Sequence, residues 1–427
     1  AQVAFQLLPN AQPMKAHLLV LAMVAVGCQK PVAGPTPSPT PFQYAYKYKH
    51  IAPEDVDNAI AFHQKRLKDA RQHPAFQIAL AQAYLAKAQV SSDVSYFGEA
   101  EKLVDAALKK QPDNKAGLTV KASLCEARHD FQGAIKILEA LEKQDPGDVD
   151  TRALLANSLM EVGRVPEALE ISKDIFRQVP TVGAALQVAR VYIAAGDDNK
   201  ARKILEVAIG QEQPMENKLS ARLRSLLGEM DVRHGRLEEA EQFFLASLDA
   251  SPENAQTTED LARLKVRQGQ LDEAEKLFMA AFARTQHPLL LREVAQIKRA
   301  RGQAEESKKM LEQAETLLRP EVRRGRYGHA RDLARVVLDL GRPEEALRLL
   351  EQEEKQRQDW RLYELKAIAL ESLKRHDEAV KALKQALGSG IQEPSLYQRA
   401  ALWEPAGGWA EKLKTLDPTF TPDSLEK

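Results

Sequence analysis

A sequence motif of about 34 residues recurs along most of the chain, and this period limits the possible folds more than any other feature. Its clearest part is a glycine followed five residues later by a small residue, as in Gly163 and Ala168. The small residues of successive copies lie 33 to 39 positions apart, at Ala100, Ala134, Ala168, Ala201, Ala240, Ala274, Ser307, Ala346 and Ala379. Such periods are typical of stacked repeats, in which each unit buries its apolar side only against its neighbours.

One copy, residues 255–288, has the pattern of two amphipathic helices joined by a turn. The apolar residues of its second half follow helical spacing, at Leu271, Ala274, Leu277, Phe278, Ala281 and Phe282. Ala262 and Ala274 are small where the two helices are expected to cross, so their backbones can approach closely. Ser251 and Pro252 predict an N-cap and a first-turn proline for the first helix.

The composition agrees with a mostly helical chain. Only 6% of the residues are aromatic and 21 of 427 are glycine, whereas 44% are apolar; strands favour aromatic and β-branched side chains. The 61 Lys and Arg residues balance 61 Asp and Glu residues. A dedicated nucleic-acid-binding protein usually carries a basic excess, so this balance argues against a nucleic-acid partner.

The repeats resemble the tetratricopeptide repeat (TPR) family, whose period is 34 residues. Two copies match most of the family positions, with Ala189, Tyr192, Gly196, Ala201, Leu205 and Ala208 in one and Gly228, Gly235, Ala240, Phe244, Ser247 and Pro252 in the other. The resemblance implies an all-α fold, a right-handed α-solenoid of about nine helix pairs over residues 75–394. We expect an N-terminal helix at 54–74 before it, and capping helices with a tail at 395–427 after it.

The N-terminal residues have the order of a secretory signal peptide. From Met14 the chain has a basic residue, an apolar run of nine residues at 18–26 and a glycine before Cys28. Nine residues are too few to span a bilayer, which needs about 20. Residues 1–13 carry no charge, and we expect translation to begin at Met14.

The end of this segment, Ala25 to Cys28, resembles the lipobox of bacterial lipoproteins. That resemblance implies that residues 1–27 are removed and that Cys28 carries acyl chains, which anchor a protein stably when two or more are present. Gln29 is not the aspartate that retains many lipoproteins in the inner membrane, so the periplasmic face of the outer membrane is favoured. Residues 28–53 then form a lipidated linker whose prolines favour an extended spacer.

Four aromatic residues alternate with other residues near the end of this linker, at Phe42, Tyr44, Tyr46 and Tyr48. A period of two predicts a short extended segment. The segment is expected to rest at lipid headgroups, to lie on the first helices or to pack on its own domain, and the sequence leaves these alternatives open.

The sequence has no recognisable catalytic or metal-binding pattern. Its nine histidines lack metal-ligand spacing, and it has no phosphate-binding glycine loop and no G-x-S-x-G. Two cysteines cannot form a disulfide framework or a four-ligand zinc site, and Cys125 is interpreted as a small core residue. Paired glutamates at 238–239, 305–306 and 344–345 fall at helix N-termini, where the helix dipole favours them. We therefore expect no enzyme activity, no cofactor and no metal.

In TPR proteins the first helix of each repeat lines a concave groove that binds the partner. Carried over, the groove positions are Asn157, Met160, Arg190, Arg222, Glu229, Glu259, Arg263, Arg292, Arg299, Arg331 and Arg335. The later positions are mostly arginine, which pairs bidentately with carboxylates, so an acidic segment or peptide carboxylate is expected to dock there. A solvated face, in which each arginine pairs with a nearby glutamate, is equally open. The TPR carboxylate clamp is not reproduced, because Ala153 stands where its lysine is expected.

These features predict a lipid-anchored scaffold or adaptor that binds protein partners in the bacterial cell envelope, without catalysis. The resemblance to TPR lipoproteins leaves secretin or pilus assembly, motility and polysaccharide export open. A catalytic or non-catalytic subunit in cell-wall or glycan metabolism is the alternative.

Overall fold

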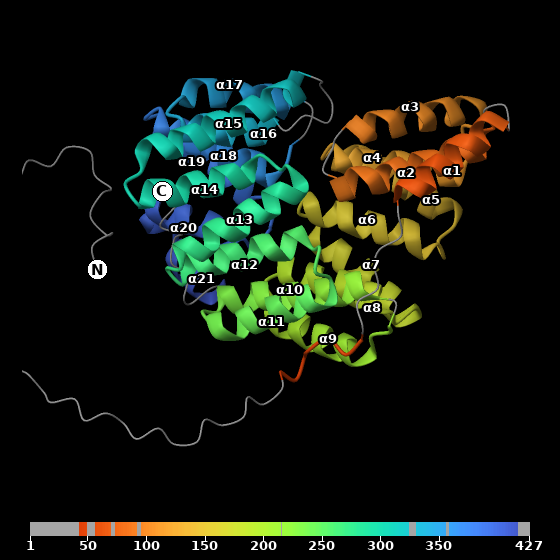
Figure 1. Cartoon of the computed structure of the whole chain (residues 1–427), viewed down its shortest axis with the longest axis horizontal. Helices are drawn as coiled ribbons and strands as arrows, with labels where there is room; N and C mark the ends of the chain where they lie inside the picture. The colour runs from red at the N-terminus through yellow and green to blue at the C-terminus, as the bar shows by residue number, and fades with distance from the viewer. Residues whose placement is uncertain are drawn as a thin grey trace, which may run out of the picture. The chain divides into compact units, whose positions relative to one another are not determined.

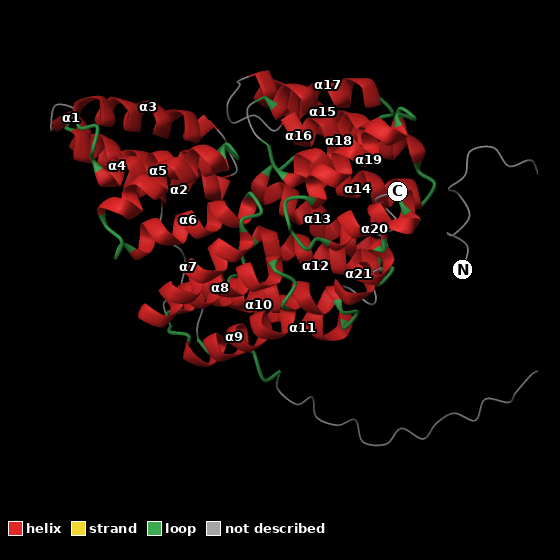
Figure 2. Cartoon of the chain, turned by 180° about the vertical axis from the view of Figure 1, so that it is seen from behind, coloured by secondary structure: helices red, strands yellow, loops and turns green. Residues whose placement is uncertain are grey.

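The computed structural model describes residues 42–48, 56–69, 73–91, 95–214, 216–323, 330–355 and 358–416, which are almost entirely helical and contain no strand (Figure 1, Figure 2). Nine helix pairs follow one another: α2 (Pro74–Ser91) and α3 (Ser95–Lys110), α4 (Lys115–Ala127) and α5 (Phe131–Gln144), α6 (Val149–Glu161) and α7 (Val165–Gln178), α8 (Val182–Ala194) and α9 (Asp198–Gln211), α10 (Asn217–Arg233) and α11 (Leu237–Ala250), α12 (Ala255–Arg267) and α13 (Leu271–Thr285), α14 (Leu289–Ala300) and α15 (Ala304–Arg323), α16 (Ala330–Asp339) and α17 (Pro343–Glu354), and α18 (Trp360–Ser372) and α19 (His376–Leu387). The all-α solenoid of about nine pairs is thereby confirmed.

Additional helices precede and follow the pairs. Helix α1 (Val56–Asp69) packs on α2, whereas α20 (Pro394–Trp403), the short 3-10 helix η1 (Pro405–Gly407) and α21 (Trp409–Leu416) follow α19. Each helix packs mainly on the helices that precede and follow it in the chain, so the core is a continuous series of local interfaces, as expected for a solenoid.

The recurring glycine ends the first helix of a pair in a left-handed turn. Gly163 has φ of 84°, and the next amide, that of Arg164, donates to the Leu159 carbonyl at 2.9 Å. A hydrogen bond of this kind closes a helix when the residue just after the helix has the left-handed backbone conformation. In two weaker copies His129 and Lys374 adopt the same conformation, with φ of 56° and 60°, so the turn persists where the glycine does not.

The small residues lie where the paired helices cross. Ala240, Ala262 and Ala274 are fully buried, and a Cβ atom on Gly228 would lie only 2.6 Å from the Phe244 ring. The Phe244 side chain thus fills the space beside Gly228, and the full burial of the three alanines agrees with small residues at a helix crossing. The N-cap prediction at Ser251 was wrong: the N-cap of α12 is Asn254, whose side chain accepts from the Thr257 amide at 3.2 Å.

Residues 42–48 pack on the middle of the array, against α9 to α11, and not on the first helices. The Phe243 ring of α11 stacks on Tyr44 and meets Phe42 edge-on, with centroid distances of 5.4 and 5.0 Å. Arg224 of α10 donates to the carbonyls of Tyr44 and Ala45 at 2.8 and 3.3 Å. Of the alternatives left open by the sequence, the structure thus favours packing of this segment on its own domain.

Candidate binding cavity

The helices after α17 return to the middle of the array. Arg361 of α18 donates to the Glu161 carboxylate at the end of α6, at 2.7 Å. The backbone amide of Gln392 donates to the Ala194 carbonyl of α8 at 3.3 Å. The loop after α19 also meets the turn after α6 so closely that a Cβ atom on Gly163 would lie 1.7 Å from the Ser389 carbonyl oxygen. These contacts join repeats that are far apart in the sequence.

A cavity of about 600 Å³ lies beside this return. Its walls come mainly from consecutive first helices of the repeats, α12, α14, α16 and α18, and from α20. Six arginines line it, Arg263, Arg267, Arg292, Arg335, Arg361 and Arg399, together with the carboxylates Glu293, Asp339, Glu364 and Glu393. Apolar side chains, including Trp360 and Ile368, form the rest of the lining. The cavity is therefore a positively charged pocket with an apolar side.

Among the positions named from the sequence, Arg263, Arg292 and Arg335 line this cavity. Arg292 is buried, and its guanidinium donates to the Asp339 carboxylate at 2.6 Å. Arg263 pairs with Glu259 on its own helix. Burial alone lowers the pKa of the Arg263 guanidinium, but the charge of Glu259 and further carboxylates raises it above its ordinary value. The charged form of the Arg263 guanidinium is thus favoured next to the cavity.

Arg299, Arg331 and Arg222 lie outside the cavity lining. Arg331 donates to both oxygens of the buried Asp359 carboxylate at 2.9 Å. Arg222 donates to Glu229 at 2.7 Å, and the exposed Arg299 donates to the Asp339 carbonyl at 3.1 Å. Arg331 therefore serves mainly as an intramolecular partner, because a buried carboxylate without a cation is strongly destabilising.

Asn157 and Arg190 lie on the first helices of earlier repeats. Asn157 and Ser158 both donate to one oxygen of Glu126, at 2.9 and 2.8 Å. Burial raises the pKa of that carboxyl group, although these two hydrogen bonds oppose the shift. Burial, followed by the charge of Arg222, lowers the pKa of Arg190, and Arg190 forms no ion pair or hydrogen bond within the described residues.

Helix α12 also contains a buried carboxyl group with an unusual pKa, that of Asp260. Burial and the neighbouring charge of Glu229 raise its pKa to about 7, and the attraction of Arg263 does not offset them. Gln256 donates to one carboxyl oxygen of Asp260 at 3.0 Å. Its protonated form is thus more favoured than that of an exposed aspartate, and the sequence pattern did not reveal this residue.

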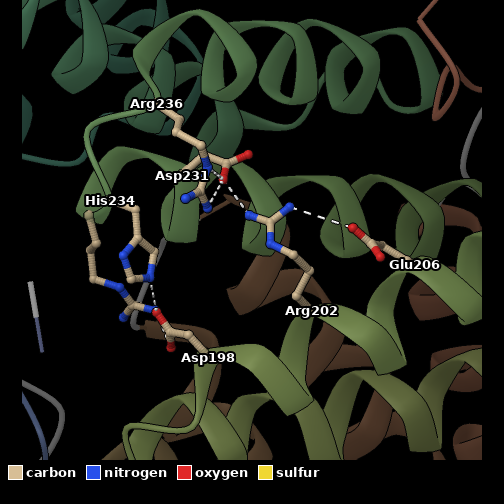
Figure 3. A network of polar contacts seen from close by, with 7 residues as sticks. Asp198, Arg202, Glu206, Asp231, His234 and Arg236 are labelled. Carbon is tan, nitrogen blue, oxygen red and sulfur yellow. Dashed lines mark hydrogen bonds and ion pairs between the residues drawn. The ribbon is translucent and has the colours of Figure 1, made fainter. Parts of the chain in front are cut away.

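A second polar network lies at the α9–α10 crossing (Figure 3). The buried carboxylate of Asp231 accepts from Arg202 and from Arg236, the latter at 2.7 Å. His234 Nε2 lies 3.0 Å from the Asp198 carboxylate. Because the Asp231 carboxylate is matched by cations from the flanking helix α9 and from the turn into α11, we assign this network to the stability of consecutive repeats.

Further chemistry is limited in the part of the chain that the structure describes. It contains no cluster of His, Cys, Asp or Glu suited to a metal ion. Cys125 is buried, and burial raises the pKa of its thiol, which agrees with a core role and disfavours the reactive thiolate. None of the described helices is long and apolar enough to cross a membrane. Cys28, the predicted lipidation site, lies outside the described residues.

The cavity includes arginines that the sequence analysis missed. Arg361 and Arg399 reach it from α18 and α20, and only the arrangement that brings α12 and α20 to one cavity reveals their role. Arg267 lies four residues after Arg263 on α12, so it shares a helix face with a residue that was named. That spacing was a signal available in the sequence.

Helix pairs that stack on one another in sequence order define an α-solenoid. In this one, first helices of the repeats line a charged cavity. One tetratricopeptide repeat model matches residues 85–149, 186–255 and 331–394, and a second matches 127–183 and 231–297. Because these segments together cover more than half of the chain, the protein belongs to the tetratricopeptide repeat family.

Solved structures similar to this chain include yeast Tom70, with 16% sequence identity, coverage of 84% of this chain and 92% of that chain, and a TM-score of 0.42. The APC/C hetero-tetramer Cut9-Hcn1 has 14% identity, coverage of 86% and 92%, and a TM-score of 0.39. A tetratricopeptide repeat protein from Parabacteroides merdae has 18% identity, coverage of 55% and 92%, and a TM-score of 0.39. No curated protein sequence matches the chain.

Proposed function

We propose that this protein is a lipid-anchored scaffold of the bacterial cell envelope that binds protein partners through the inner surface of its repeats. The observation that carries the proposal is the array of first helices, which presents arginines to a cavity of about 600 Å³. Tetratricopeptide repeats are protein-interaction scaffolds, and solenoids use such inner surfaces for binding. The charge of this surface favours an acidic segment of the partner.

The anchor rests on the sequence around Cys28. The basic residue, the apolar run and the small residue before this cysteine have the order of a lipoprotein signal. Gln29 in the next position favours the periplasmic face of the outer membrane. The proline-rich spacer that follows would hold the solenoid away from the bilayer, within reach of partners in an envelope complex such as a secretin, pilus, motility or polysaccharide-export assembly.

The anchor is tested by fractionating cells that express the full chain. Cys28→Ala should move the protein from washed membranes to the soluble fraction, because it removes the site of acylation. Cys125→Ala is the matched control, since it removes the other cysteine and should leave the protein in membranes. Retention of Cys28→Ala in washed membranes would contradict lipid anchoring.

The scaffold role is tested by cross-linking the native protein in intact envelopes, followed by affinity capture and mass spectrometry. A binding scaffold should capture a defined set of envelope proteins, and the yield should fall with rising salt if acidic segments dock on arginines. Capture of no envelope protein above the level of an unrelated membrane protein would contradict the proposal.

A further inference from the structure

Two arginines of the cavity have no partner among the described residues. Arg267, at the end of α12, and Arg335, in α16, both line the cavity and form neither an ion pair nor a hydrogen bond there. Asp339 lies four residues after Arg335, at a spacing that often gives an ion pair. It accepts instead from Arg292 at 2.6 Å and from Gln296 at 2.9 Å.

The other arginines of the cavity are matched by carboxylates. Arg361 donates to Glu161 at 2.7 Å, and Arg399 donates to Glu364 at 3.3 Å. Glu364 also accepts from the Ser395 hydroxyl at 3.0 Å. Asp339, Glu161 and Glu364 are thus paired with other arginines, and none of them forms an ion pair with Arg267 or Arg335.

Two more carboxyl groups line the cavity, and neither forms an ion pair with Arg267 or Arg335. Glu293 lies 3.5 Å from the Arg292 guanidinium. Glu393 is not held by any cation within 4 Å in the described part of the chain, and burial, followed by the charge of Glu364, raises the pKa of its carboxyl group. Six arginines stand against four carboxyl groups in the lining, so the lining carries an excess of positive charge even when Glu393 is ionised.

We propose that this cavity binds a small organic oxyanion, with Arg267 and Arg335 as its cationic contacts. Guanidinium groups present planar, bidentate donors that match carboxylate and phosphate oxygens. The apolar lining formed by Leu338, Trp360 and Ile368 suits the carbon portion of the ligand. The volume of about 600 Å³ lies in the range of small-molecule sites, roughly 300 to 1,000 Å³.

Two kinds of ligand carry the anionic oxygens that such a site needs, a small molecule and an acidic peptide segment. A free metabolite with phosphate or carboxylate groups supplies them directly, and acidic side chains of a partner segment supply them in a peptide. Both place anionic oxygens at Arg267 and Arg335. The site is independent of the lipid anchor, and its occupation by a small anion does not require a protein partner.

Isothermal titration calorimetry of the full chain with phenyl phosphate at constant ionic strength tests the proposal. The wild type should bind phenyl phosphate and not the neutral benzyl alcohol. Arg267→Gln and Arg335→Gln should each weaken binding about ten-fold or more, the value expected for a lost hydrogen bond to a charged group. Arg348→Gln is the matched control, because Arg348 is exposed on α17, lies outside the cavity and also forms no ion pair.

A second titration separates the two sources. An acetylated and amidated peptide of alternating Glu and Gly should compete with phenyl phosphate if partner segments enter the cavity, and should leave its affinity unchanged if only small anions fit.

Thermal melting and circular dichroism confirm that each variant is folded, and Arg267→Lys and Arg335→Lys, which keep the charge, should retain part of the affinity. Absence of phenyl phosphate binding by the wild type, or equal affinity of the wild type and both glutamine variants, would overturn the proposal. The yield of partner capture remains a separate measurement, so failure of the oxyanion site does not imply failure of the scaffold.

Discussion

Arg361 donates to Glu161 at 2.7 Å although 200 residues separate them in the chain. The two residues belong to α18 and α6, six helix pairs apart. The Arg361 guanidinium also lies 4.4 Å from the centroid of the Trp360 ring, which lines the cavity. A long-range ion pair therefore borders the candidate binding site and links its geometry to the return of the C-terminal helices.

The contribution of this ion pair can be measured with a double-mutant cycle of Glu161→Gln and Arg361→Gln. Because the Arg361 side chain is 41% exposed, solvent screens the pair, and we expect a coupling free energy of roughly 0.5 to 1 kcal/mol from urea unfolding. The cation–π contact with Trp360 is lost only in the Arg361 variants, and the cycle removes it. A coupling energy of zero would show that the ion pair does not stabilise the return.

The glycine turns allow a sharper test of the same contact. Gly163→Ala and Gly269→Ala both place a Cβ on a left-handed residue, with φ of 84° and 76°, at a cost of roughly 1 to 2 kcal/mol. Only at Gly163 does the new Cβ meet another backbone, 1.7 Å from the Ser389 oxygen, whereas nothing lies within 4 Å at Gly269. Gly163→Ala should therefore reduce the free energy of unfolding by a clearly larger amount. Equal losses in the two variants would mean that the Gly163–Ser389 contact is absent in solution.

The sequence predicted the repeat architecture because each repeat carries its own signals. The glycine at the turn and the alanine at the crossing, such as Gly235 and Ala240, act within one helix pair, so a local pattern is sufficient to identify them. Arg361 of α18 and Gln392 of the loop after α19 meet α6 and α8, and such a return reflects small rotations that add up over many repeats. No single residue encodes that sum, and the part of the cavity formed by Arg361 and Arg399 was therefore missed.

The predicted groove residues show a related limit. Asn157 donates to Glu126, 31 positions earlier, and Arg331 pairs with Asp359, 28 positions later. Both partners lie about one repeat away, where adjacent first helices come together. A residue on the groove face is thus free for a ligand only if the neighbouring repeat offers it no partner. Arg335 meets this condition within the described residues, and its binding role stays a prediction.

Arg224 joins the segment 42–48 to the middle of the array. Its fully buried guanidinium donates to both oxygens of Glu212, at 2.8 and 3.0 Å, and to the carbonyl of Tyr44. Arg224→Met should reduce the free energy of unfolding by about 3 to 5 kcal/mol, because the Glu212 carboxylate remains buried without a cation. Limited proteolysis with mass spectrometry should also show faster cleavage within 42–48.

The control for this effect is a variant that removes both charges. Arg224→Met combined with Glu212→Gln leaves no unpaired buried carboxylate, and replacing a whole buried pair is far less costly than breaking it. The double variant should therefore recover much of the lost stability, but it should still release residues 42–48, since the Tyr44 carbonyl has lost its donor. A double variant as unstable as Arg224→Met would contradict the role of the ion pair.

Asp260 makes the stability of the array dependent on pH. Burial and the charge of Glu229 raise the pKa of Asp260 to about 7 in the folded chain, whereas an unfolded aspartate has a pKa of about 3.9. Between these values the folded protein binds more protons than the unfolded chain, so this group lowers the stability as the pH rises from about 4 to about 7.

Asp260→Asn removes the titration, and the free energy of unfolding of the variant relative to the wild type should rise across this window, by at most about 1.4 kcal/mol per pH unit. Glu229→Gln removes the neighbouring charge and should move the end of the window to lower pH. Urea unfolding at closely spaced pH values measures both effects, and a wild type that gains stability relative to Asp260→Asn between pH 4 and 7 would show that the folded chain stabilises the ionised carboxylate instead.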